Sequence, residues 1–307
     1  MTTPIEEIIP RSLPEDVSAV LNEFKDSIEE MVNFGSVILS WDLSRKGSDE
    51  DLPPVLFLRN FLENVDAISV LIKYSSVESC KILLRTALEN VFYLGYILQS
   101  DSKNRALAFI VWNTINNNKL LNQADSTSNE YKELLKKYKN DTFLKDSKPP
   151  IIANTSELIK LGEKIFLLPK FLPIKEEYDN TKKLLKKKPA WYTLFDGPRT
   201  IEELANRVKL GALYEVLYRN WSGSIHGTNI IQGKFITSSD QEHELMQLRH
   251  PKDAQSITLY CSNLCLMVFK NYLSVRNPEK LPAFLEWYLT IRDSFNQLSQ
   301  HQKIKII

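Results

Sequence analysis

The chain has 307 residues, of which 43% are hydrophobic and 25% charged, and it contains only 9 glycines. This composition is typical of a soluble globular protein and excludes collagen-like, low-complexity and wholly disordered chains. Because turn-rich β-sandwiches and phosphate-binding loops both use glycine heavily, the shortage of glycine argues against an all-β fold and favours long helices. The formal net charge of +1 is far from the strongly positive charge of dedicated nucleic-acid-binding proteins.

Charge is unevenly distributed along the chain. Residues 1–66 carry 14 acidic and 5 basic side chains, which leaves 34 basic and 24 acidic side chains for residues 67–307. We therefore predict an acidic N-terminal helical arm over residues 1–50 and a helical domain over residues 51–307. Residues 119–188, with 16 lysines, no arginine and 10 acidic residues, are predicted to be a lysine-rich helical elaboration of that domain. Its run Lys182–Lys188 fits a solvated helix face, and contact with phosphate is the alternative.

Apolar residues recur at the three- and four-residue spacing of amphipathic helices. The first helix is expected over Pro14–Trp41 and the second over about Val55–Tyr74, and Ser44–Pro54 between them is predicted to be an exposed loop. The third helix, over about Val77–Leu98, is apolar on every side from Val91 onward. Only a helix covered by its neighbours has this pattern, so it is predicted to be the central helix.

The remaining helices follow the same spacing. A fourth is expected over about Lys103–Leu121, and prolines then divide the chain into shorter pieces. Helical spacing resumes between Ile201 and Trp221, and two more helices are predicted over about Pro251–Val275 and Pro278–Leu298. Short connections between long helices favour antiparallel neighbours. The predicted fold is therefore an all-α multi-helix bundle.

Several common site types are missing from the sequence. Cys80, Cys261 and Cys265 are predicted to be buried thiols of a cytoplasmic protein. No His-Glu-x-x-His, paired Cys-x-x-Cys, Walker loop or dinucleotide fingerprint occurs, so we expect neither a metal site nor a cofactor. The longest apolar stretch, around Val91–Leu98, is far too short to cross a bilayer, and no secretory signal is present, so no membrane association is expected.

Polar residues that suit phosphate chemistry occur between Tyr214 and Gly227, in the sequence YEVLYRNWSGSIHG. At the ideal angle between successive helical residues, one stripe is expected in the core and a second lies beside it. The core stripe comprises Tyr214, Tyr218, Trp221 and Ile225, and the second comprises Glu215, Arg219, Ser222 and His226. Arg219 and His226 are two turns apart and are expected to project to the same side, whereas Asn220 points elsewhere. The other three histidines, His243, His250 and His301, lie in polar segments and are expected at the surface.

This spacing resembles a known motif. Arg219, followed by Asn220, five residues and His226, is similar to the Arg-x(4–6)-His motif of the HEPN superfamily of helical nucleotide-binding domains. A wider set of residues resembles the prokaryotic domain-of-unknown-function family 5677, over about Val55–Phe269. That set comprises the run Arg85-Thr-Ala-Leu-Glu89-Asn90, Tyr93, Trp191 and the series Tyr214-x3-Tyr218-x3-Ser222-x3-His226. The resemblance implies an all-helical HEPN-like core and an association with mobile-element and phage-defence settings.

The resemblance also implies an activity, namely metal-independent endoribonuclease cleavage by a toxin or effector of bacterial phage defence. His226, which titrates near neutrality, would move protons, and Arg219 would stabilise the charge of the phosphorane. Asn220 or Ser222 would orient the histidine or the phosphate. Since HEPN ribonucleases build their site across a dimer interface, the implied partners are RNA, a second copy of the chain, and an antitoxin or defence protein.

Alternatives remain open for each of these residues. Arg85 and Glu89 are four apart, so they form either an intrahelical ion pair or a support for a polar pocket that includes His226, with Tyr93 and Tyr218 as further supporting residues. Arg219 alternatively pairs with Glu215, while His226 caps a helix. The alternative function is a non-catalytic helical module that binds nucleotide, RNA or a partner protein, which the balanced charge favours. A third hypothesis is that the acidic arm masks the basic remainder.

Overall fold

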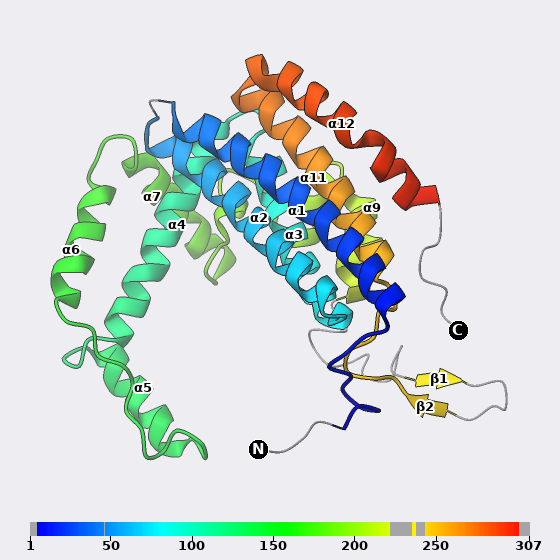
Figure 1. The fold of residues 1–307 in the computed structure, drawn as a ribbon. Coiled ribbons are helices and arrows are strands. Elements are labelled where there is room, and N and C mark those ends of the chain that lie inside the picture. The colour runs from blue at the N-terminus through cyan, green and yellow to red at the C-terminus, as the bar shows by residue number, and fades with distance from the viewer. Residues whose placement is uncertain (1–4, 46, 222–234, 238–242, 301–307) are drawn as a thin grey trace. The chain divides into compact units, whose positions relative to one another are not determined.

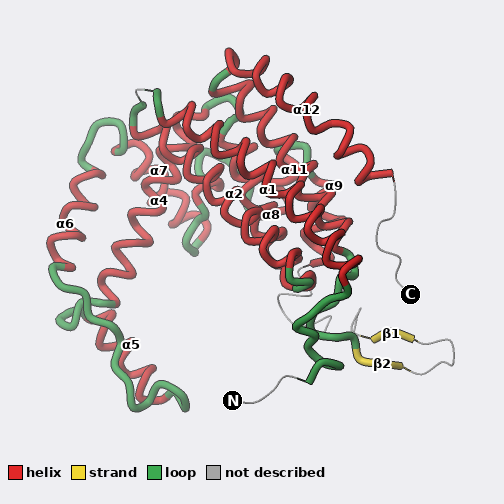
Figure 2. Tube along the Cα trace, viewed as in Figure 1, coloured by secondary structure: helices red, strands yellow, loops and turns green. Residues whose placement is uncertain are grey.

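A computed structural model describes the chain except for residues 1–4, 46, 222–234, 238–242 and 301–307. The chain divides into two compact units. The first unit comprises residues 1–48, 54–100 and 200–307, and the second comprises residues 49–53 and 101–199. Helices dominate the described part of both units (Figure 2), which confirms the predicted all-α class.

The long helices of the first unit begin and end within a few residues of their predicted positions. Residues 278–280, predicted as the start of the last helix, instead form a separate 3₁₀ turn. Figure 1 labels most of the helices. The first unit contains α1 (Glu15–Leu43), most of α2 (Leu52–Lys73), α3 (Val77–Ile97), α8 (Ile201–Arg207), α9 (Gly211–Leu213), α11 (Ala254–Arg276) and α12 (Leu281–Gln300). A π-helical turn, Tyr214–Arg219, directly continues α9.

Helix α1 is an integral part of the first unit's core. It lies alongside α11, as Figure 1 shows. The side chains of Leu21, Phe24, Ile28 and Ile38, spaced along one face of α1, are completely buried. Burial of this many large side chains is a major source of folding free energy. The acidic N-terminal segment therefore contributes a full helix to the packing of this unit.

A buried polar cluster joins the C-terminal end of α1 to that of α11. The completely buried carboxylate of Asp42 accepts a hydrogen bond from the hydroxyl of Tyr272. Arg276 donates to both oxygens of the same carboxylate at 3.0 Å, and Arg45 donates to Oδ1 at 3.1 Å. A buried carboxylate needs such partners because its desolvation cost is otherwise prohibitive. These bonds hold two helices together that lie about 230 residues apart in sequence.

Helix α3 occupies the position expected for a central helix, with α11, α8 and the π-helical turn packed around it. Val91, Phe92 and Leu94 are buried, as the all-round apolar pattern predicts. The three thiols are also buried, which confirms that prediction. Burial raises the pKa of Cys80 to about 12 and also raises the pKa values of Cys261 and Cys265. None of the three is therefore an activated nucleophile.

A short sheet interrupts the helical pattern after the π-helical turn. Strand β1 (Phe235–Thr237) pairs antiparallel with β2 (His243–Leu245), with Phe235 opposite Leu245. His250 follows, and its backbone N–H donates to the carbonyl of Ser75 at 2.9 Å. The prediction that His250 is a surface residue is wrong, because this bond draws it into a half-buried position beside the start of α3.

The second unit has its own helices and its own hydrophobic core. Its long helices are α4 (Ser102–Gln123), α5 (Asn129–Asn140), α6 (Thr155–Phe166) and α7 (Leu172–Leu185). Two 3₁₀ turns, Asp49–Asp51 and Trp191–Thr193, complete it. The core joins α4 to the end of the unit through Leu107, Ala108, Val111, Phe171, Ile174, Tyr178 and Leu194. The predicted loop Ser44–Pro54 is shorter than expected, because the first of these turns and the start of α2 occupy its second half.

None of the helices described in either unit is long and apolar enough to cross a membrane.

Candidate functional site

Three of the predicted supporting residues meet between α3 and the π-helical turn. Arg85 and Glu89, one turn apart on α3, form an ion pair at 3.2 Å. The hydroxyl of Tyr218 accepts a hydrogen bond from Arg85 Nη2 at 2.7 Å and donates one to Glu89 Oε1 at 2.6 Å. The guanidinium carbon of Arg85 also lies 4.0 Å from the centroid of the Tyr218 ring. We call these three residues the Arg85–Tyr218–Glu89 cluster.

The cluster is shielded from solvent without being sealed. Tyr218 is buried, while the side chain of Arg85 is 17% exposed and that of Glu89 is 27% exposed. Burial raises the pKa of Tyr218, and the hydrogen bond to Glu89 and the charge of that carboxylate raise it further, against the opposing effect of Arg85. The phenol therefore stays protonated at neutral pH and remains a hydrogen-bond donor to the carboxylate.

The backbone that carries Tyr218 is a π-helix over Tyr214–Arg219. A π-helix closes its hydrogen bonds at i→i+5 and so changes the angle between successive side chains. Tyr214 and Tyr218 stack within this turn, with ring centroids 5.1 Å apart and an interplanar angle of 22°. The turn departs from a regular α-helix, yet the neighbours expected within each stripe are in contact, Tyr214 with Tyr218 and Glu215 with Arg219. Short π-helical turns are frequent at functional sites.

Arg219 and Asn220 lie at the solvent-facing end of this turn. The side chain of Arg219 is 67% exposed and pairs with Glu215 at 3.1 Å, which is the ion pair proposed from sequence as the structural alternative. Asn220 Nδ2 donates to the carbonyl of Val216 at 2.8 Å. Within the described part of the chain, neither residue is bonded to the Arg85–Tyr218–Glu89 cluster. Ser222 and His226 lie outside the described residues.

Two other residues of the sequence pattern have different surroundings. Tyr93, predicted as a supporting residue, packs against Phe57 with ring centroids 5.5 Å apart. Trp191 belongs to the second unit, where it packs against Phe109 at 5.7 Å. Tyr214 was expected only as a core residue, yet it is half-buried and supports the cluster through Tyr218. The Tyr-x3-Tyr spacing was the signal for this contact.

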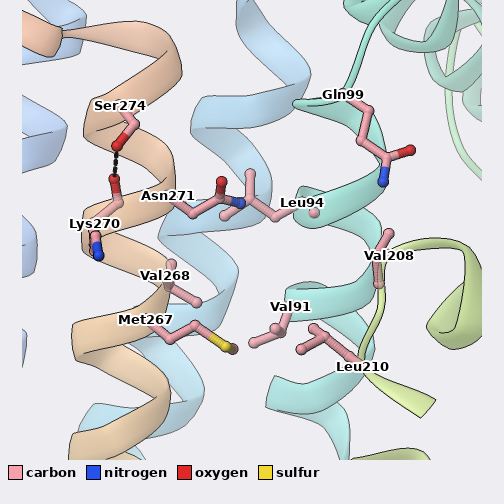
Figure 3. A pocket seen from close by; sticks show the side chains of 11 residues that line it. Val91, Leu94, Gln99, Val208, Leu210, Met267, Val268, Lys270, Asn271 and Ser274 are labelled. Carbon is pink, nitrogen blue, oxygen red and sulfur yellow. Dashed lines mark hydrogen bonds between the residues drawn. The ribbon is translucent and has the colours of Figure 1, made fainter.

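A separate pocket lies between α3, the turn after α8, and α11. Its volume is about 410 Å³, within the range of small-molecule sites. Figure 3 shows Met267 and Asn271 extending from α11 toward Val91 and Leu94 of α3, with Val208 on the same side as α3. Of the predicted site residues that the structure describes, none lines this pocket. Most of the residues that line it are apolar, and Lys270 also lines it.

Among the described residues, no group of three or more His, Cys, Asp or Glu side chains is placed to hold a metal ion. The chemistry available at the Arg85–Tyr218–Glu89 cluster and at Arg219 is that of guanidinium, phenol and carboxylate groups.

The model of DUF5677, a family of unknown function, matches residues 51–243. This segment includes the Arg85–Tyr218–Glu89 cluster, Arg219 and all of the second unit except residues 49 and 50, and it ends before α11. No curated protein and no solved structure matches the chain.

Proposed function

The chain belongs to the DUF5677 family, and from this premise we propose that it is an endoribonuclease with a HEPN-like core that cleaves single-stranded RNA without a metal ion. The observation that carries the proposal is the Arg85–Tyr218–Glu89 cluster. It bonds the central helix to the turn that presents Arg219 to solvent and that leads into Ser222 and His226.

The proposed reaction needs only side chains. The ribose 2′-oxygen attacks the adjacent phosphorus while its proton passes to His226, and the bond from phosphorus to the 5′-oxygen breaks as that oxygen takes up a proton from water. The products are a 2′,3′-cyclic phosphate and a 5′-hydroxyl. Arg219 would bind the phosphorane oxygens, because guanidinium is always charged and bonds two oxygens at once. Asn220 or Ser222 would orient the phosphate or the imidazole.

In this proposal the Arg85–Tyr218–Glu89 cluster is a positioning device. Its groups are bonded to one another, so they fix the turn that carries Arg219. The proposed assembly is a homodimer in which two copies of the site face each other, and the proposed setting is bacterial phage defence, with an antitoxin or defence partner in the cytoplasm.

The test is cleavage of a single-stranded RNA by the purified protein in EDTA, with the 2′,3′-cyclic phosphate detected by mass spectrometry. His226→Ala is expected to abolish cleavage while the far-UV circular dichroism is unchanged. Arg219→Gln is expected to slow it by about 100-fold or more, the cost of removing one group that stabilises the transition state. Arg292→Gln is the matched control, because Arg292 is also an exposed arginine beside a carboxylate, Asp293 at 3.0 Å. RNA that survives high protein concentration, or equal cleavage by all variants, would refute the proposal.

The second candidate function is a non-catalytic module that binds nucleotide, RNA or a partner protein. It is favoured by the net charge of +1 and by the pairing of Arg219 with Glu215, which leaves that guanidinium partly neutralised. Binding of RNA with no cleavage product, by wild-type protein and by His226→Ala alike, would support it over the nuclease.

The hypothesis that the acidic N-terminal segment masks the basic remainder of the chain from RNA needs a test that does not disturb folding. Deletion of residues 1–50 would remove α1 and its buried side chains, so it would report on folding. Glu15→Gln with Asp16→Asn neutralises two exposed carboxylates and leaves the buried face of α1 intact. A gain in RNA affinity is expected if the segment masks, and an unchanged affinity would remove the hypothesis.

A further inference from the structure

Six exposed lysines gather where α7 ends beside α4. Lys182 and Lys183 lie in the last turn of α7, and Lys186, Lys187 and Lys188 follow its end. Lys119 lies near the end of α4, the helix against which α7 packs. We call these six residues the lysine cluster. Lys186 has a φ of 51°, in the left-handed region, so the helix stops there and the last three lysines leave its axis.

The ammonium groups of this cluster are close enough to influence one another. The pKa of Lys188 is lowered, first by partial burial and then by the positive charges of Lys119 and Lys182. A lysine whose charge is disfavoured by its neighbours gains when an anion binds beside it, because the anion relieves the repulsion. Lysines from α4 and from the end of α7 therefore form one positively charged patch.

The acidic residues closest in sequence are already engaged. Asp179 pairs with Lys175 at 2.5 Å. Glu177 accepts hydrogen bonds from the Thr181 hydroxyl at 2.8 Å and from the Phe195 N–H at 3.0 Å. Within the described residues, no member of the lysine cluster forms an ion pair. Elsewhere in the same unit, Lys103 and Lys170 are neutralised by Glu50 and Asp49, at 3.2 and 2.5 Å.

Helix chemistry explains only part of the cluster. Cations in the last turn complement the helix dipole, which accounts for Lys182 and Lys183. Lys186, Lys187 and Lys188 lie beyond that turn and have no such partner in the helix. The helix dipole therefore does not account for these three lysines, and solvation of an exposed face or binding of an anion are the two alternatives.

We propose that the lysine cluster binds the phosphate backbone of single-stranded RNA. This inference rests on the proposed function and deepens it, by assigning the surface of the second unit that holds the substrate strand. Lysine is a compact point charge without the planar fork of arginine, so a surface with lysine alone holds phosphates without selecting bases. The cluster therefore contributes affinity that depends strongly on salt and little on sequence.

An anionic membrane is the less suitable partner. Peripheral helices that bind lipid carry a continuous apolar face opposite the charged one. The apolar side chains Ile174 and Tyr178 of α7 are instead buried in the core of the second unit, which leaves Leu184 as the exposed apolar residue among the lysines. A single leucine does not provide such a face.

The test measures binding of full-length protein to a fluorescent 2′-O-methyl oligonucleotide, which lacks the attacking hydroxyl and so is not cleaved. Anisotropy titrations from about 50 to 200 mM KCl give the slope of log K against log salt concentration. The variant Lys186→Gln, Lys187→Gln, Lys188→Gln is expected to lower the affinity at least about tenfold and to reduce the slope by about 2, since each phosphate contact to a single strand contributes about 0.7.

The matched control is Lys132→Gln, Lys139→Gln, Lys145→Gln. It removes the same charge from three exposed lysines of the same unit, on α5 and just after it. This variant is expected to keep the wild-type affinity and slope. Equal losses in both triple variants, no loss in either, or no binding of the oligonucleotide by wild-type protein would overturn the inference. Binding to phosphatidylserine vesicles that depends on the cluster, with none to the oligonucleotide, would also overturn it.

The outcome for this surface is separable from the outcome for the nuclease. If the cluster variant cleaves RNA with a raised KM and an unchanged kcat, both proposals stand. Cleavage with wild-type KM refutes the cluster alone. Cluster-dependent binding by a protein that never cleaves refutes the nuclease alone. Thermal unfolding followed by circular dichroism verifies that both triple variants are folded.

Discussion

At the residue scale, the most informative side chain is Tyr218, because its hydroxyl serves as acceptor for Arg85 and donor for Glu89. An ion pair one turn apart on a helix contributes only a few tenths of a kcal/mol by itself. The tyrosine adds two bonds to charged groups in a site with little solvent, where such bonds are stronger. The Tyr218 hydroxyl therefore joins the π-helical turn to α3 through both members of the ion pair.

Tyr218→Phe is expected to lower the free energy of unfolding by about 1–3 kcal/mol, since it removes a hydrogen-bonding hydroxyl and leaves two half-buried charged groups with one partner fewer. Urea denaturation followed by circular dichroism measures the change. Tyr214→Phe is the control, because the Tyr214 ring stacks on Tyr218 while its hydroxyl has no hydrogen-bond partner in the described structure. It should cost less than about 0.5 kcal/mol. Similar losses in both variants would show that ring packing dominates.

His250 is a second residue whose surroundings determine a property, in this case its protonation. Its Nδ1 accepts a hydrogen bond from the backbone N–H of Lys252 at 3.1 Å, so this nitrogen is unprotonated in the native state. Burial lowers the pKa of His250, the charge of Lys252 lowers it further, and Asp253 acts in the opposite direction. Protonation is therefore easier in the unfolded chain than in the folded protein.

We expect stability to fall as the pH drops through the unfolded histidine pKa of about 6.5 and toward the lowered native value, because the unfolded state then binds the additional proton. Above pH 7 the contribution of this group is fully present. His250→Asn places an amide oxygen near the position of Nδ1 and does not titrate. Its urea midpoint should be less sensitive than that of the wild type between pH 7 and 5.5. Parallel pH profiles for the two proteins would contradict this assignment.

At the element scale, three helices of the first unit approach one another closely at Gly35 of α1. A Cβ at this position would overlap the side chain of Leu62 on α2 and approach Phe269 Cζ on α11 at 3.0 Å. Both neighbours are buried, so neither has free space into which to move. Glycine is required here by the close approach of three helices. Gly95 on α3 differs, because a Cβ there would meet Val208 at an ordinary distance of 3.4 Å.

The two glycines therefore predict opposite effects of the same substitution. Gly35→Ala is expected to destabilise the protein by about 1–3 kcal/mol through overpacking. Gly95→Ala is expected to stabilise it by about 0.5–1 kcal/mol, because alanine costs less backbone entropy than glycine in a helix. Urea denaturation of the two variants side by side measures both changes. Destabilisation by Gly95→Ala would show that the space beside Val208 is smaller than the structure indicates.

At the scale of the whole molecule, the chain forms two units with separate cores. The first unit is organised around α3 and α11, and the second around α4 and α7. The chain passes between them near residues 48, 53, 100 and 199. Each core is made by side chains of its own unit. A substitution that destabilises one core should therefore increase local unfolding mainly within that unit.

Tyr178→Ala removes a buried side chain from the core of the second unit. The expected loss is about 3–5 kcal/mol, the range for truncating a large core residue. Hydrogen–deuterium exchange should show faster exchange of α4 and α7 amides, while α1 and α11 keep their protection. Accelerated exchange across both units would show that they unfold together, and unchanged exchange would place Tyr178 outside the stabilising core.

Much of this architecture was predictable because helices are local structures. The bounds of α1, α3 and α4 lie within about two residues of the sequence prediction, since the side chains that drive helix packing recur with the period of the helix itself. The pairing of Arg85 with Glu89 followed from the same period. Burial of the thiols followed from their apolar neighbours.

Contacts between distant segments were decided only by the tertiary structure. Tyr218 meets Glu89 across 129 residues, and Tyr272 meets Asp42 across 230. A periodic pattern indicates which face of a helix is buried, but it does not specify the partner on the other side. The π-helical turn at Tyr214–Arg219 also differs from the uniform angle between successive residues that a periodic pattern assumes. The sequence alone thus determined where the helices lie and which of their faces are buried. The Arg85–Tyr218–Glu89 cluster depended on packing between segments that are far apart in the chain.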